Sequence, residues 1–449
     1  MVVAGGRSAR RSGAGRAAAW GLGVLLAAAA AADPPAAPEV PMQRWLVVCL
    51  DGTWNNAERG VEREGGRTLY KPTNVLKLYR AVLPVAPDGV TTQIAYYNEG
   101  VGAFIGEKTR LTRLQTVTDR IFGGAFGGGF EGRVKEAYRF LVGNYRPGDR
   151  IAVFGFSRGS AQARSLVRFV DWTGGLVEKR DEYYIPELFE AFRDGAARPG
   201  AAAEALAAIR ARRGGSPEAI ADPRPVAIDF LGIFDTVFSL GSRLGADRSE
   251  GEIHGVGLRW AFHLGAAPPP IVRVARQAMA IDETRWDYRV HVWRRPGAPG
   301  QSLVQMWFPG VHTNVGGGRQ NDGLANAALH WMADEAEAAG LALDRDFLKR
   351  YRPWWGDDRP TSPSRLFRFL DWVRGKRGDG VRRLEYPPEA GVGIHRSAFL
   401  LLIDDDPERP RYRPANLLEY LREHPEALRG SSDEERARVE AVLRSAGGD

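Results

Sequence analysis

The chain has 449 residues, of which 44% are hydrophobic and 26% charged, a composition typical of a folded globular protein that excludes an intrinsically disordered one. The formal net charge of +7 favours contact with anionic surfaces such as phospholipid headgroups. The alternative is a merely soluble basic surface, because the arginines are dispersed. No zinc-ligand spacing, basic aromatic motif or repeat supports nucleic-acid binding. A single cysteine, Cys49, excludes an intramolecular disulfide and a cysteine-based metal cage.

Residues 1–41 have the pattern of an export signal. Four arginines come first, an apolar run spans 17–32, and a small-residue segment with prolines follows. We therefore expect an exported protein, periplasmic or secreted, or one held by an uncleaved anchor. Met42 stands directly before the first expected strand, so a start of translation there would instead leave a cytoplasmic protein.

The first expected strand, 45–50, runs into the polar sequence D-G-T-W-N-N at 51–56. Parallel α/β sheets present their binding groups at the carboxyl ends of the strands. Gly52 lets the chain turn so that the N–H groups that follow, beginning with Thr53, face inward, and we assign this turn as an oxyanion donor. Asp51 either hydrogen-bonds this turn or takes part directly in catalysis, and both interpretations stay open.

A helix with one apolar face at 73–82 and a strand at 91–97 complete a β-α-β opening, which indicates a parallel sheet. Glycines are dense from 100 to 132, but the spacing of a phosphate-binding loop is missing, so we interpret this stretch as a loop over the active site. Another helix is expected at 131–145.

A strand, a sharp turn and a helix at 150–165 surround the sequence G-F-S-R-G-S, which in this context is typical of a nucleophile elbow. Gly155 and Gly159 would leave room for the strained turn that exposes the hydroxyl of Ser157. The N–H of Arg158, at the start of the helix, supplies the other oxyanion donor. The alternative is an ordinary turn in which the serine side chain caps the helix.

Two later strands end in candidate catalytic side chains. The strand expected at 226–234 runs into Asp235, where an α/β hydrolase keeps the acid of its triad. The strand expected at 302–308 is followed by a glycine-flanked loop that carries His312. With the elbow serine, these residues follow the order nucleophile, acid, base. His395 is the alternative base.

The remaining segments complete an α/β-hydrolase-like fold, with a mostly parallel sheet flanked by helices and with helical and loop insertions. Helices at 185–192 and 201–212 belong to an insertion at about 180–222 that we assign to a lid or cap, and a further helix is expected at 271–281. We divide the chain into three parts: a signal-like or anchor segment at 1–41, a catalytic domain at 42–338, and a helical C-terminal extension at 339–449.

Seven motifs occur in one order along the chain: L-D-G-T-W-N-N, T-N-V-L-K-L, Y-N-E-G-V-G, G-F-S-R-G-S, F-L-G-I-F-D-T-V, A-I-D-E-T-R and W-F-P-G-V-H-T-N-V-G-G-G. From about residue 44 to about 330 the chain therefore resembles the α/β-hydrolase family of type VI secretion phospholipase effectors, long catalogued as a domain of unknown function. The resemblance implies a serine esterase with Ser157, Asp235 and His312 at the triad positions. It also implies phospholipids as the substrate class.

We expect acyl-ester hydrolysis that needs neither cofactor nor metal. The expected partners are a lipid or other ester substrate and a membrane surface, and nucleic acid is not among them. Two alternatives stay open, namely a soluble esterase acting on a non-lipid substrate and a non-catalytic envelope or binding module that keeps the fold. The sequence identifies neither a secretion partner nor an immunity partner.

Overall fold

The computed structural model describes residues 44–52, 60–62, 68–100, 126–195, 198–212, 220–237, 265–285, 288–319, 321–354, 380–387, 389–429 and 431–446. Several sequence expectations lie outside these residues: the export signal, the turn at Thr53 and most of the glycine-rich loop after Gly100. Residues Met42–Asp449 form one compact unit, which includes the segment predicted as a C-terminal extension.

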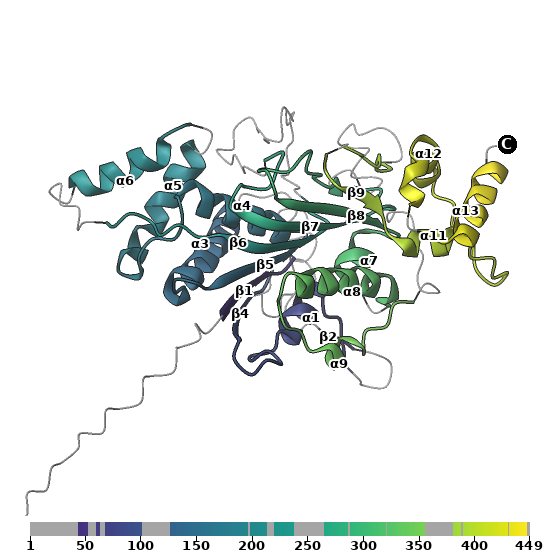
Figure 1. Ribbon diagram of the computed structural model, residues 1–449, viewed down its shortest axis with the longest axis horizontal. Coiled ribbons are helices and arrows are strands. Elements are labelled where there is room, and N and C mark those ends of the chain that lie inside the picture. Colours follow the sequence, from purple (N-terminus) through teal and green to yellow (C-terminus); the bar gives the residue numbers. More distant parts are fainter. Residues whose placement is uncertain are drawn as a thin grey trace, which may run out of the picture. The chain divides into compact units, whose positions relative to one another are not determined.

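Seven parallel strands form the central sheet (Figure 1). From one edge to the other they are β4 (Thr92–Asn98), β1 (Arg44–Leu50), β5 (Arg150–Phe156), β6 (Ile228–Phe234), β7 (Val272–Ala280), β8 (Ser302–Phe308) and β9 (Val392–Ile394). The pairing register places Phe156 beside Phe234 and Ala280 beside Phe308. Because the strands are parallel, the segments that follow β1, β5, β6, β7 and β8 all emerge at the same edge of the sheet.

Helices cover both faces of the sheet (Figure 1). In β1, Leu46, Val48 and Leu50 are buried on the side of α3 (Phe126–Asn144) and α4 (Arg158–Trp172). The alternate residues Trp45, Val47 and Cys49 are buried on the side of α1 (Asn74–Ala81) and α8 (Gly323–Ala338). Both faces of the strand are therefore apolar, as expected for a central strand of a parallel sheet.

Smaller elements complete the described residues. They are the antiparallel pair β2 (Gly60–Glu62) and β3 (Thr68–Tyr70), the 3-10 helices η1 (Lys179–Tyr184) and η4 (Pro425–Leu428), and the helices α5 (Ile185–Gly195), α6 (Ala201–Arg212), α7 (His312–Gly316), α9 (Arg345–Leu348), α11 (Arg396–Leu402), α12 (Ala415–Glu423) and α13 (Asp433–Ser445). No helix among these residues is long and apolar enough to cross a membrane. They also contain no cluster of three or more His, Cys, Asp or Glu side chains placed to hold a metal ion.

The prediction of a helix at 271–281 is wrong, because this segment forms the strand β7 between β6 and β8. Its alanines, arginines, glutamine and methionine are good helix formers, and its polar residues do not alternate as they would in a half-exposed strand. The six residues from Ala275 to Ala280 are all buried, so burial in the sheet outweighs the intrinsic preference of the segment.

Two further differences concern the surroundings of the predicted site. His312 was expected on a loop, but it is the first residue of the short helix α7. The C-terminal segment was expected to be helical, and it also contributes β9, which pairs with β8 at the edge of the sheet.

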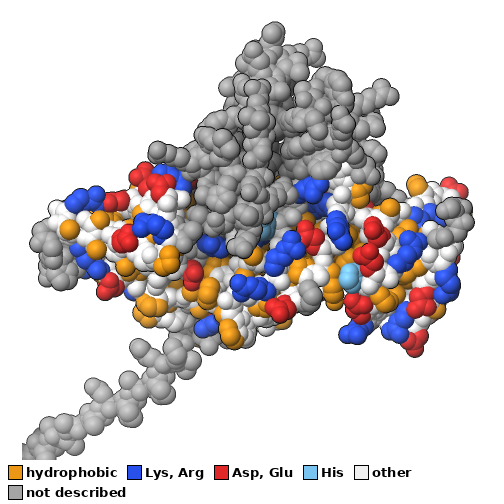
Figure 2. All heavy atoms as spheres, turned by 90° about the horizontal axis from the view of Figure 1, so that it is seen from above, with side chains coloured by type: hydrophobic (Ala, Val, Ile, Leu, Met, Phe, Trp, Pro, Cys, Tyr) orange, Lys and Arg blue, Asp and Glu red, His pale blue; other side chains and the backbone are white. Residues whose placement is uncertain are grey.

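Figure 2 shows Lys and Arg side chains interspersed with Asp and Glu over the described part of one face, without a single basic patch there.

Candidate active site

The turn between β5 and α4 is strained at Ser157, whose φ of 57° lies in the left-handed region. A Cβ atom on Gly155 would lie 2.6 Å from the carbonyl oxygen of Gly159, and one on Gly159 would lie 2.1 Å from the carbonyl oxygen of Leu50. Only glycine fits at both positions. The N–H of Ser157 donates to the carbonyl of Phe234 at 3.0 Å, which ties the turn to the end of β6.

Ser157 stands at the N-cap of α4, but its side chain makes no capping hydrogen bond. The hydroxyl is therefore not engaged by the helix, as it would be in an ordinary serine-capped turn. The helix begins at Arg158, so the N–H groups of its first turn point out of its N-terminal end, beside Ser157. Burial lowers the pKa of the Arg158 guanidinium to about 10.

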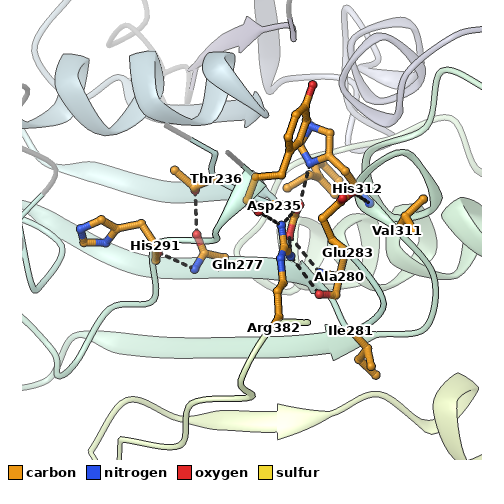
Figure 3. A network of polar contacts seen from close by, with 12 residues as sticks. Asp235, Thr236, Gln277, Ala280, Ile281, Glu283, His291, Val311, His312 and Arg382 are labelled. Atoms are coloured by element: carbon orange, nitrogen blue, oxygen red, sulfur yellow. Dashed lines mark hydrogen bonds and ion pairs between the residues drawn. The ribbon is translucent and has the colours of Figure 1, made fainter. Parts of the chain in front are cut away.

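Asp235 follows β6 directly, is completely buried, and has a φ of 40°. Its backbone N–H donates to the carbonyl of Ala278 at 2.7 Å, and its Oδ1 accepts the N–H of Ala280 at 2.9 Å. Its Oδ2 lies 2.6 Å from Nδ1 of His312 (Figure 3). The end of β7 thus orients the carboxylate toward the imidazole.

The imidazole of His312 is enclosed by two aromatic rings. The ring of Phe156, the residue before Ser157, stacks on it with 4.7 Å between centroids, and the ring of Tyr288 meets it edge-on at 5.1 Å. Since Nδ1 is bonded to Asp235, Nε2 is the nitrogen that can accept a proton from a substrate or nucleophile. The contact with Phe156 places this ring beside the strained turn.

The protonation states of the pair suit a general base. Burial would raise the pKa of Asp235, but the guanidinium of Arg382 and the bond to His312 outweigh it and hold the pKa well below its usual range. Burial lowers the pKa of His312, and the bond to Asp235 opposes this effect only in part. At neutral pH the pair is therefore a carboxylate beside a neutral imidazole.

Sequence reasoning missed Arg382, which lies 147 residues after Asp235 in the chain. Its Nη1 donates to Oδ1 of Asp235 at 2.6 Å and its Nη2 to Oδ2 at 2.9 Å, a two-pronged ion pair that Figure 3 shows opposite His312. No local pattern distinguishes this arginine from the many others of the chain, so no sequence signal could have found it.

The motif A-I-D-E-T-R at 280–285 supplies two carboxyl groups that bond the segment of His312. Oδ2 of Asp282 accepts the N–H of Gly310 at 2.6 Å, and Oε2 of Glu283 accepts the N–H of His312 at 3.2 Å. Burial raises the pKa of Asp282 to about 7, whereas in Glu283 two bonds from Arg285 outweigh burial and lower the pKa. Both carboxyl groups hold the segment that carries the histidine. Because the sequence predicted a helix before them, it gave no signal that they lie at the edge of the sheet.

Asp51 is buried at the end of β1 and bonds its own turn. Its Oδ1 accepts the N–H of Gly52 at 2.6 Å, and its Oδ2 accepts the hydroxyls of Thr73 and Tyr97, both at 2.6 Å. Burial raises the pKa of Asp51 to about 6. Of the two interpretations left open, this geometry matches the turn-binding one. The N–H of Gly52 is thus engaged by Asp51, and the residues from Thr53 onward, predicted to supply an oxyanion donor, lie outside the described residues.

The alternative base, His395, lies between β9 and α11. Its Nδ1 accepts the N–H of Ser397 at 3.3 Å and so caps α11, and its ring stacks on Phe308 with 4.3 Å between centroids. Burial lowers the pKa of His395 to about 4. Among the described residues it bonds neither Asp235 nor Ser157, so the structure gives this histidine a capping role.

A parallel sheet with helices on both faces, a strained serine turn and a buried Asp–His pair at one sheet edge define an α/β-hydrolase-like protein. The family described as "T6SS, Phospholipase effector Tle1-like, catalytic domain" matches residues 44–335, well over half of the chain. The protein therefore belongs to the Tle1-like phospholipase effector family of the type VI secretion system.

Other similarities are more distant. A stretch of 144 residues is 34% identical to an uncharacterised protein of Saccharomyces cerevisiae, covering 30% of this chain and 19% of that protein, so the chain spans about a fifth of that relative. Two solved structures each share a TM-score of 0.36 and 16% identity with this chain. The match to an uncharacterised protein from Pseudomonas aeruginosa covers 91% of this chain and 62% of that chain. The match to the Tle1 effector bound to the VgrG spike covers 74% of this chain and 79% of that chain.

Proposed function

We propose that this protein is a serine esterase that hydrolyses the acyl-ester bonds of phospholipids, with Ser157 as nucleophile, His312 as general base and Asp235 as the acid that orients the base. The observation that carries the proposal is the 2.6 Å bond between Asp235 and His312 beside the strained turn of Ser157. The substrate class follows from membership of a phospholipase family.

In the proposed reaction, Oγ of Ser157 attacks the ester carbonyl carbon while its proton passes to Nε2 of His312. The imidazolium then gives this proton to the leaving alcohol oxygen as the ester bond breaks, which leaves an acyl-enzyme. A water molecule repeats the sequence, releases the fatty acid and restores the serine hydroxyl. Asp235 stays ionised throughout and stabilises the imidazolium in both steps.

The oxyanion is proposed to bind the N–H of Arg158 at the start of α4 and an N–H of the turn that begins at Thr53. Two features support this assignment. The N–H groups of the first turn of α4 point out of the N-terminal end of the helix, and Gly159 packs directly on the carbonyl of Leu50, which brings this helix start against the end of β1. Loss of one such donor typically costs about 3 kcal/mol of transition-state stabilisation.

A fluorophosphonate probe tests the nucleophile, and fatty-acid release from phospholipid micelles tests the substrate. The unmutated protein should be labelled and should release fatty acid, and both signals should disappear in Ser157→Ala and His312→Ala. Ser165→Ala, which removes another buried serine of α4, and His330→Ala, which removes a histidine of α8, are matched controls that should keep both signals.

Each negative result in these assays would contradict a different part of the proposal. Labelling that persists in Ser157→Ala would contradict the assignment of the nucleophile. Labelling without fatty-acid release would retain the serine hydrolase but replace phospholipid by a different ester substrate. An unlabelled protein would favour a binding module that has kept the fold.

A further inference from the structure

We propose that Arg382 is a positioning residue of the catalytic centre: it orients the carboxylate of Asp235 and balances its charge, so that the C-terminal segment completes the active site. This inference rests on the proposed function. It adds a residue outside the region 44–335 that matches the family.

Arg382 and Asp235 form a buried, two-pronged ion pair. The planar guanidinium of Arg382 meets both oxygens of Asp235, at 2.6 Å and 2.9 Å, so it specifies the plane of the carboxylate as well as its position. The side chains of Arg382 and Asp235 are 4% and 0% exposed, so water does not screen the interaction. One of these oxygens, Oδ2, also accepts from His312.

The guanidinium of Arg382 is itself held by backbone carbonyls. Its Nη1 also donates to the carbonyl of Ala280 at 2.9 Å (Figure 3), and its Nη2 donates to the carbonyl of Tyr288. Ala280 in turn donates its N–H to Oδ1 of Asp235. Guanidinium, carboxylate and the end of β7 thus form one closed hydrogen-bond network, in which rotation of the carboxylate would break several bonds together.

Hydrogen bonds attach the C-terminal segment to the residues that follow β7. The side-chain amide of Asn416 donates to the carbonyl of Arg382 at 3.0 Å and to that of Ile281 at 2.9 Å. The hydroxyl of Tyr412 donates to Asp282 at 2.8 Å. The segment that carries the arginine is therefore bonded to the same strand end that supports the histidine.

The charge of Arg382 has a chemical consequence for His312. Other ionisable side chains lie near the imidazole of His312. Glu283 accepts the backbone N–H of His312, Arg285 pairs with Glu283, and the ring of Tyr288 contacts the imidazole. With Arg382 in place, the negative charge of Asp235 is largely balanced, and the imidazolium gains less from it. Without Arg382 the unbalanced carboxylate would favour the imidazolium and raise the pKa of His312.

The test is the pH profile of kcat/KM for a soluble ester in Arg382→Met. We expect kcat/KM to fall about 100-fold at neutral pH, because the carboxylate no longer orients the base, and we expect the acid limb to move to higher pH. Arg276→Met is the matched control. Arg276 is also buried and also bonds a carboxylate, Glu335 at 2.6 Å, together with backbone carbonyls, but it lies outside the site.

A second variant distinguishes the orienting role of Arg382 from the effect of its positive charge. It also provides the test if Arg382→Met does not fold. Arg382→Lys keeps the positive charge but loses the two-pronged contact, so we expect a lower kcat with the acid limb of the unmutated protein. The proposal is overturned if Arg382→Met retains the unmutated rate and acid limb, or if Arg276→Met moves the limb equally. Full activity of Arg382→Lys would overturn the orienting role.

Failure of this inference is distinguishable from failure of the proposed function. If Ser157 is not the nucleophile, fluorophosphonate labelling persists in Ser157→Ala, whatever Arg382→Met does. If only the role of Arg382 is wrong, labelling still depends on Ser157 and the pH profile of Arg382→Met matches that of the unmutated protein.

Discussion

Gly316 and Phe156 are in such close contact that a Cβ atom on Gly316 would lie 1.8 Å from a carbon of the Phe156 ring. Gly316 ends α7, the helix that begins at His312, and Phe156 precedes Ser157. The contact therefore joins the segment of the base to the segment of the nucleophile. Since Phe156 also stacks on the imidazole, one ring sets the spacing between both elements.

Gly316→Ala should separate these elements. The added methyl group must displace α7 or the Phe156 ring, so we expect a loss of about 1–3 kcal/mol in the free energy of unfolding and a fall of about 100-fold in kcat/KM. Thermal unfolding and ester hydrolysis measure the two effects. Gly132→Ala in α3 is the control, since its Cβ would contact nothing within 4 Å. Equal activity of the two variants would contradict the prediction.

Gly159→Ala should abolish fluorophosphonate labelling. Its Cβ would lie 2.1 Å from the carbonyl oxygen of Leu50 and 2.7 Å from that of Asp51, both backbone atoms that cannot move away without shifting β1. The start of α4 would move outward and carry the nucleophile with it. Ser165→Ala, on the same helix, should label normally. Labelling of a folded Gly159→Ala at the unmutated rate would show that the turn tolerates a side chain.

The acid limb of kcat/KM should lie below the ordinary histidine value of 6.5, because burial lowers the pKa of His312. Activity requires the neutral imidazole, so it persists as the pH falls to that lowered pKa and is lost below it. Asp235→Asn should reduce kcat by about 10,000-fold, since the amide favours the wrong tautomer of the imidazole. A pH series with a soluble ester measures both. An acid limb above the ordinary histidine value would contradict the assignment of His312.

The free energy of unfolding of Asp282→Asn should rise relative to that of the unmutated protein as the pH increases. The pKa of Asp282 is raised by burial to about 7 in the folded protein, from 3.8, so the folded state binds a proton that the unfolded state has already released. The stabilising contribution of this carboxyl is therefore present below its unfolded pKa and is lost as the pH rises through about 7. The amide cannot ionise, so the variant lacks this loss.

Denaturant unfolding of Asp282→Asn and of the unmutated protein at acidic and alkaline pH measures the difference. Both bonds to Asp282, from Gly310 and from Tyr412, end on the same oxygen, so the asparagine oxygen can accept both. We expect the variant to gain up to about 4 kcal/mol relative to the unmutated protein between the two conditions, since each unit of the pKa shift corresponds to about 1.4 kcal/mol. A stability difference that does not change with pH would refute the raised pKa.

Much of the fold was predictable because local patterns and local sterics specify it. The strand at 302–308 is confirmed at its full length, and the helices at 73–82 and 201–212 are confirmed within a residue. The strand β7 was not predictable in this way, because helix-favouring residues occupy it and only its place between two other strands makes it extended.

The residues of the candidate site also differ in whether local sequence patterns could predict them. Local sequence suffices to predict the turn at Ser157, since Gly155, Gly159 and the flanking strand and helix act within a few residues of each other. It also placed Asp235 and His312 at strand ends, where a parallel sheet gathers them. The tertiary structure alone decided that His312 bonds Asp235 while His395 caps a helix, and that Arg382 binds the carboxylate. Those contacts join residues far apart in the chain, and their energies depend on burial that no local pattern encodes.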